Sequence, residues 1–70
     1  MKMQEIKKEF IRDNQEWIYN NRNDIVTINY NFNCYIDGLC KDGAITYNQY
    51  YRASGFTKAD ITRELKKLMF

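Results

Sequence analysis

Apolar residues in the N-terminal part of the chain recur at the spacing of an amphipathic helix over residues 2–21. Charged and polar residues fill the positions between them, so one face of this helix would be apolar and the other solvated. The apolar positions are Met3, Ile6, Phe10, Ile11, Trp17 and Ile18. Residues 20–24, with the letters NNRND, are poor helix formers that tolerate turns. We therefore predict that the first helix ends there.

Residues 25–36 fit two periodicities. A strand-like alternation joins Val26, Ile28, Tyr30, Phe32, Cys34 and Ile36. A helical period joins Ile25, Ile28, Phe32, Tyr35 and Leu39. The remaining chain offers no second strand, so a strand here would need another protein or a second copy of the chain as its partner. We predict a helix over residues 29–41, with residues 24–28 extended or fraying. The alternative is an α+β fold in which residues 25–36 form a strand paired in a homodimer.

Thr46 begins a capping box. Its hydroxyl can accept a hydrogen bond from the backbone N–H of Gln49, and the Gln49 side chain can accept one from the backbone N–H of Thr46. Gly43 stands where the end of the preceding helix needs a left-handed residue. We therefore predict a short helix over residues 46–54.

The last helix has a similar start. Thr57 and Asp60 repeat the capping box with a shorter acidic side chain, and Gly55 precedes them as a second predicted left-handed residue. These signals predict a helix over residues 57–70. Its apolar face would comprise Ile61, Leu65, Leu68, Met69 and Phe70.

Length and composition place these helices in one small domain, residues 1–70. The chain has no Pro and three Gly, which suits helices joined by short turns. The core would be rich in aromatic rings, because there are six Tyr, four Phe and one Trp. We predict an all-α fold of three to four helices with a helix-turn-helix-like corner at its C-terminal end.

The chemistry of the side chains argues against catalysis. The chain contains no His, the commonest general base and metal ligand. Cys34 and Cys40 would lie on different faces of a helix, so we predict free, partly buried thiols and a cytosolic compartment. No apolar run approaches the ~20 residues that a membrane span needs. The net charge of +2 does not dictate a polyanionic partner. We predict a cytoplasmic, non-enzymatic protein with no cofactor, no metal and no membrane contact.

The letters ASGFTKADITREL (residues 53–65) are similar to the start of a recognition helix, and residues 46–67 resemble a DNA-binding helix-turn-helix motif. Gly55 in the turn and Ile61 after it match that motif, whereas Tyr51 departs from its small-residue position. The resemblance implies a transcriptional regulator that binds duplex DNA. It implies groove contacts by Thr57, Lys58, Ala59 and Thr62, and candidate phosphate contacts by Arg52, Arg63, Lys66 and Lys67.

The many aromatic residues indicate a protein-binding surface. Four short helices cannot enclose every Tyr and Phe, and exposed Tyr beside Arg is enriched at interfaces. The predicted contact face comprises Tyr47, Tyr51, Arg52, Lys58 and Arg63.

In its small size, its Asn- and Tyr-rich composition and its lack of catalytic groups, the chain resembles phage or mobile-element inhibitors of the anti-CRISPR type. That resemblance implies a host protein or nucleoprotein complex as the partner, in the cytoplasm of the host cell. The alternatives are the DNA-binding regulator and an oligomerisation module that forms a homodimer.

Overall fold

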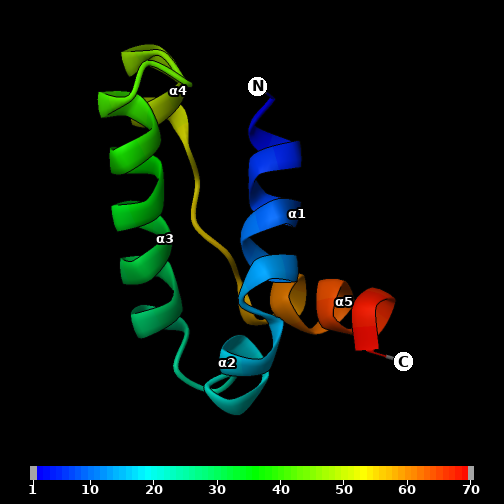
Figure 1. The fold of residues 1–70 in the computed structure, drawn as a ribbon. Helices are drawn as coiled ribbons and strands as arrows, with labels where there is room; N and C mark the ends of the chain where they lie inside the picture. The colour runs from blue at the N-terminus through cyan, green and yellow to red at the C-terminus, as the bar shows by residue number, and fades with distance from the viewer. Residues whose placement is uncertain (1, 70) are drawn as a thin grey trace.

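The computed structural model describes residues 2–69, which form five α-helices (Figure 1). They are α1 (Met3–Asp13), α2 (Gln15–Asn20), α3 (Ile25–Lys41), α4 (Tyr47–Arg52) and α5 (Lys58–Met69). Residues 2–69 contain no strand, so the predicted all-α fold is confirmed and the strand alternative is not adopted. None of these helices has the length and apolar character needed to cross a bilayer. The predicted core position Phe70 lies outside the described residues.

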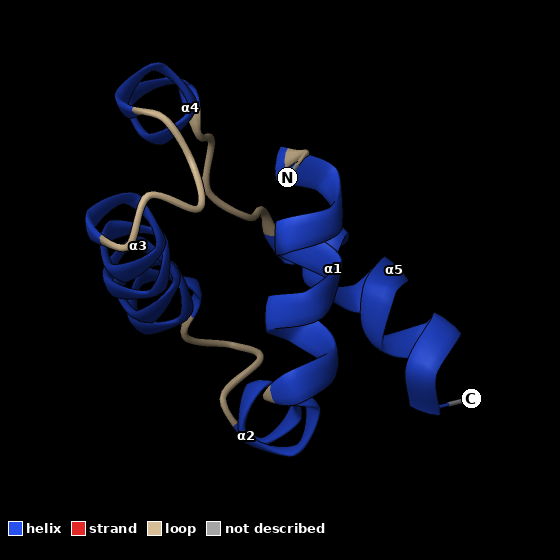
Figure 2. Cartoon of the chain, turned by 45° about the horizontal axis from the view of Figure 1, so that its top comes forward, coloured by secondary structure: helices blue, strands red, loops and turns tan. Residues whose placement is uncertain are grey.

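Helices α1 and α3 lie side by side and run in opposite directions (Figure 1). Helix α2 closes one end of this pair, and α4 lies against α3 at the other end (Figures 1 and 2). Helix α5 packs against α1 and α2. Residues 53–57, which we call the connector, leave α4, run between α1 and α3, and reach the start of α5 (Figures 1 and 2).

Three phenylalanine rings form the centre of the core, and they come from α1 (Phe10), α3 (Phe32) and the connector (Phe56). Phe32 meets Phe10 and Phe56 edge-on, with ring centroids 5.2 and 4.8 Å apart. Phe10 and Phe56 are stacked at 6.1 Å. Edge-on and offset-stacked pairs are the favoured aromatic geometries. The other buried residues are Ile6, Ile11, Ile18, Ile28, Ile36, Ile45, Ile61 and Leu65.

One asparagine of α3 holds the connector in place. The Asn29 amide nitrogen donates to the backbone carbonyl of Phe56 at 2.9 Å, and its oxygen accepts from the Phe56 N–H at 2.7 Å. Asn29 thus satisfies both backbone groups of a buried residue, as a neighbouring strand would. From α1, Lys7 donates to the Ser54 hydroxyl at 3.2 Å and to the Gly55 carbonyl at 3.4 Å. We call the two Asn29–Phe56 hydrogen bonds the asparagine clamp.

The prediction of one helix over residues 2–21 is wrong, because the helix breaks at Asn14. The Asn14 side chain donates to the Phe10 carbonyl at 2.8 Å, and the Asn14 backbone leaves helical geometry at φ −121° and ψ 21°. A short amide side chain that bonds the backbone competes with the helical ladder. After the break, Ile18 is buried while Trp17 remains 38% exposed, so Trp17 is not a core position.

Helix α3 begins at Ile25 instead of at the predicted residue 29. The Asp24 carboxylate caps it by accepting hydrogen bonds from the Thr27 backbone N–H at 3.2 Å and from the Thr27 hydroxyl at 2.7 Å. The cap satisfies one of the first backbone donors of the helix. Residues 25–28 are helical, so the prediction that residues 24–28 are extended or fraying is wrong for all of them except the capping residue Asp24.

Both predicted capping boxes are present. Thr46 and Gln49 exchange hydrogen bonds of 3.1 and 3.0 Å, and Thr57 and Asp60 exchange bonds of the same lengths. Gly43 adopts the predicted left-handed conformation, with φ 78°. The helix starts in the C-terminal half are therefore encoded locally.

Gly55 does not adopt the left-handed conformation predicted for it. Its lack of a side chain leaves room for the clamp, since a Cβ there would lie 2.7 Å from Oδ1 of Asn29. Helix α4 ends at Arg52, earlier than the predicted residue 54, and the extended connector separates it from α5. The predicted helix-turn-helix-like corner is not confirmed, because α4 packs on α3 while α5 packs on α1 and α2.

Replacing the clamp residue should destabilise the fold. Asn29→Ala leaves the Phe56 N–H and C=O without partners, so we expect the free energy of unfolding to fall by about 1–3 kcal/mol. The matched control is Asn31→Ala, because the exposed Asn31 side chain bonds only the Thr27 carbonyl of its own helix. Urea unfolding followed by circular dichroism measures both variants. Equal unfolding free energies would show that the clamp contributes nothing.

The space at Gly55 gives a second test of the clamp. Gly55→Ala pushes a methyl group against the Asn29 amide, so we expect it to lower the free energy of unfolding by about 1–2 kcal/mol. The collision requires the Asn29 side chain, so the cost of Gly55→Ala should largely disappear in the Asn29→Ala background. A double-mutant cycle of urea unfolding measures this coupling. Additive effects would contradict the assigned contact.

Candidate functional site

Helix α4 exposes two of its three aromatic rings. Its 6 residues, YNQYYR, include none that is buried. The Tyr47 and Tyr51 residues are 71% and 76% exposed, and their rings stack with centroids 6.2 Å apart. Tyr50 meets the Tyr51 ring edge-on at 5.6 Å. Together with the exposed Arg52, these three tyrosines form a surface that we call the tyrosine tip.

A few local contacts hold this short helix in position. Thr46 and Gln49 cap its first turn, Ile45 before the cap is buried, and Tyr50 packs partly against the core. This arrangement anchors one side of α4 on α3. Residues four apart share a face of a helix, so Tyr47 and Tyr51 point together toward solvent.

The charges around the tyrosine tip are simple. At the end of α3, the Lys41 ammonium lies 3.0 Å from the Asp37 carboxylate. The hydrogen bond to Asp37, helped by its negative charge, raises the pKa of Lys41 above its ordinary 10.5, and this ion pair offsets the charge of Lys41. Helix α4 itself carries no carboxylate, and Arg52 makes no ion pair within residues 2–69. The tip is therefore aromatic with one cationic group.

The five predicted contact residues do not form one face. Tyr47, Tyr51 and Arg52 lie on α4, whereas Lys58 and Arg63 lie on α5. Figures 1 and 2 place these two helices at different ends of the molecule. The structure therefore separates the aromatic part of the predicted face from most of its basic part.

Apart from Arg52 on α4, the predicted nucleic-acid contacts are all exposed at the start or along the length of α5. They are Thr57, Lys58, Ala59, Thr62, Arg63, Lys66 and Lys67. Acidic neighbours offset part of this positive charge, because Arg63 lies 3.0 Å from Asp60 and Lys67 lies 3.5 Å from Glu64. The Thr57 hydroxyl is occupied by the capping box. Among the described cations of α5, Lys58 and Lys66 remain without an ion pair.

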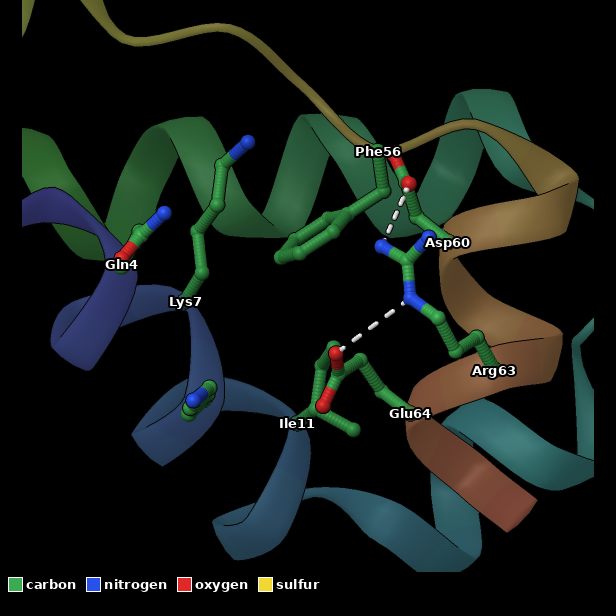
Figure 3. A pocket seen from close by; sticks show the side chains of 8 residues that line it. Gln4, Lys7, Ile11, Phe56, Asp60, Arg63 and Glu64 are labelled. Carbon is green, nitrogen blue, oxygen red and sulfur yellow. Dashed lines mark hydrogen bonds and ion pairs between the residues drawn. The ribbon is translucent and has the colours of Figure 1, made fainter. Parts of the chain in front are cut away.

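A hollow of about 250 Å³ lies between α1 and α5 (Figure 3). Its lining residues are Gln4, Lys7, Lys8, Ile11, Phe56, Asp60, Arg63 and Glu64. Phe56 and Ile11 form its apolar part, and Figure 3 shows Arg63 bridging Asp60 and Glu64 at the α5 side. Most ligand pockets are larger, at about 300–1,000 Å³. Both carboxylates of the lining, Asp60 and Glu64, already pair with Arg63, so this hollow is a weaker candidate than the tyrosine tip.

Within residues 2–69, no group of three or more His, Cys, Asp or Glu side chains could hold a metal ion. Cys34 and Cys40 are free, as predicted. Cys34 is exposed, contrary to the predicted partial burial, because it lies opposite the core face of α3; Cys40 is partly buried.

Two structural features were not predicted from the sequence. Asn29 was not recognised as the residue that holds the connector, although a polar residue next to the buried positions Ile28 and Phe32 was a usable signal. The outward row of Val26 and Tyr30 was also missed, because its geometry depends on a helix that begins at Ile25. Val26 is 76% exposed and Tyr30 is 69% exposed.

The fold and the tyrosine tip together define a small all-α domain with an exposed aromatic surface. Comparison with protein-family models, with curated protein sequences and with solved structures finds no match to this chain.

The Asp60 carboxyl should titrate at low pH. Hydrogen bonds from Thr57 lower the pKa of Asp60 below its ordinary 3.8, and Arg63 adds to this effect. Because the pKa is lower in the folded chain, ionised Asp60 stabilises the fold above about pH 4, and this contribution is lost as the pH falls through the lowered pKa. Between about pH 5 and pH 2, the free energy of unfolding should therefore fall less in Asp60→Asn than in the wild-type protein.

An NMR titration of the Asp60 side chain checks the cause of the shift. We expect a midpoint below 3.8 in the wild-type protein, and a midpoint that stays below 3.8 in Arg63→Gln, because Thr57 contributes more than Arg63. A wild-type midpoint at or above 3.8 would contradict the assignment.

Proposed function

We propose that this protein is a non-enzymatic interaction protein that binds a partner protein through the tyrosine tip. The observation that carries the proposal is the stacked, solvent-exposed pair of Tyr47 and Tyr51 on a helix that buries none of its residues. Two large rings that lie together in solvent form an exposed aromatic patch, and such patches mark interaction sites. Here, only Tyr50 packs partly against the core.

The chemistry of the tip suits a protein interface. Tyr and Arg are enriched among the residues that dominate binding energy, and a large aromatic ring buries about 150–250 Å². Tyr47 and Tyr51 already hold each other in place in the free protein, so binding orders fewer side chains. Arg52 adds one cation that can pair with a carboxylate of the partner.

The proposed class of partner rests on a resemblance. The Asn- and Tyr-rich chain without His resembles phage and mobile-element inhibitors of the anti-CRISPR type. This resemblance supports a host protein or nucleoprotein complex as the partner and inhibition by surface occupation as the mode of action. Direct reading of duplex DNA by α5 is the competing function, and the experiment below distinguishes the two.

The test replaces the tip and measures capture of a partner. Tagged protein carrying a photo-crosslinking amino acid at position 51 should yield one specific protein adduct in host cells, and the same amino acid at position 62 should not. Tyr47→Ala combined with Tyr51→Ala should weaken binding to that protein at least about tenfold, because two interface tyrosines are removed. Both side chains are exposed, so the thermal midpoint should be unchanged.

The matched control is Lys58→Ala combined with Lys66→Ala on α5. It should leave protein binding unchanged. If the chain instead reads DNA, a titration of labelled duplex will show affinity that falls log-linearly with salt and drops in this control variant. Partner binding that survives loss of both tip tyrosines would refute the proposal.

A further inference from the structure

The hollow between α1 and α5 has two walls that differ in charge (Figure 3). On the α5 wall, the Arg63 guanidinium lies 3.0 Å from the Asp60 carboxylate and 3.7 Å from the Glu64 carboxylate. Lys67, which lies outside the lining, is a further 3.5 Å neighbour of Glu64. Both carboxylates of the lining are therefore already matched by cations of α5.

The α1 wall presents two ammonium groups without a carboxylate partner. Lys7 and Lys8 both line the hollow, and neither makes an ion pair within residues 2–69. The Lys7 ammonium lies 5.1 Å from the centre of the Phe56 ring. Its hydrogen-bond acceptors, the Ser54 hydroxyl and the Gly55 carbonyl, are both uncharged. The α1 wall therefore carries positive charge that no described side chain neutralises.

The donors of the α1 wall lie beside an apolar surface. Gln4, Lys7 and Lys8 are three or four positions apart along α1, except for the adjacent lysines, so they point to one side of the helix. The Gln4 amide can donate a hydrogen bond next to the two ammonium groups. Ile11 and Phe56 form the apolar part of the lining. A few convergent polar groups beside apolar side chains are typical of a ligand site.

From this arrangement we infer that the hollow binds a small organic carboxylate. The carboxylate group accepts hydrogen bonds from the ammonium groups of Lys7 and Lys8, and such charge-assisted bonds are among the strong ones. The apolar body of the ligand lies against Phe56 and Ile11. A cationic ligand is disfavoured, because it would meet two ammonium groups while both carboxylates of the lining are occupied.

The size of the hollow limits the body of the ligand. Its volume of about 250 Å³ is below the about 300–1,000 Å³ of sites for drug-sized ligands, so a single ring or a short chain fits. A ligand held between α1 and α5 stabilises the folded chain, because it binds the folded state and not the unfolded one. The inference does not depend on the proposed function, since the tyrosine tip lies on α4, outside this hollow.

An NMR titration of the full chain with benzoate tests the inference. We expect saturable shifts of the backbone amides of residues 4–11 and 60–64, with a dissociation constant of about 1 mM, and a rise in the thermal midpoint. Benzamide has the same ring without the charge, so it should bind at least about tenfold more weakly. Inorganic phosphate has charge without an apolar body, and it should also bind more weakly than benzoate.

Lys8→Gln tests the charge of the α1 wall. It removes an exposed ammonium group that makes no ion pair in the described chain, so benzoate should bind about fivefold more weakly while the thermal midpoint without ligand stays unchanged. The matched control is Lys66→Gln, which makes the same change on α5 outside the hollow and should bind benzoate like the wild type.

Four results would each overturn the inference. They are benzoate shifts that do not saturate or that map elsewhere, equal affinities for benzoate and benzamide, phosphate binding as tight as that of benzoate, and equal benzoate affinities of Lys8→Gln and Lys66→Gln.

Discussion

The two hydrogen bonds between Asn29 and Phe56 are the constraint on which the arrangement of the helices depends. An extended segment that passes between two helices must find partners for its backbone, because a buried N–H or C=O without one is costly. Asn29 supplies both partners from a single side chain. The Phe56 ring can then lie between Phe10 and Phe32, and the connector links the two halves of the core.

The extended connector also separates the aromatic surface of α4 from the mixed-charge surface of α5. Because the connector is extended, α4 and α5 lie far from each other, and each packs on a different helix. Helix α4 keeps only Tyr50 partly against the core, which leaves Tyr47 and Tyr51 in solvent. On α5, Arg63 and Lys67 pair with Asp60 and Glu64 instead of lying near the tyrosines. An aromatic surface and a mixed-charge surface therefore result where the sequence predicted one combined face.

The sequence predicted that Tyr47 and Tyr51 are exposed, but it did not predict that they lie apart from Lys58 and Arg63. Both outcomes have physical reasons. Exposure of Tyr47 and Tyr51 follows from too many aromatic rings for so small a core, and this could be argued without coordinates. The separation of Tyr51 from Lys58 could not be argued from the sequence. It depends on whether residues 53–57 turn tightly or extend, and a glycine at position 55 is compatible with both. The decisive residue, Asn29, lies far from the connector along the chain.

The helical class and the helix starts at Thr46 and Thr57 were determined by the sequence alone, since capping boxes and the left-handed Gly43 act over a few neighbouring residues. The exposure of Trp17 beside the buried Ile18 and the path of the connector were decided only by the tertiary structure. In each of these cases, two local conformations were open to the chain. The choice between them rests on contacts between residues distant in sequence, which no local pattern encodes.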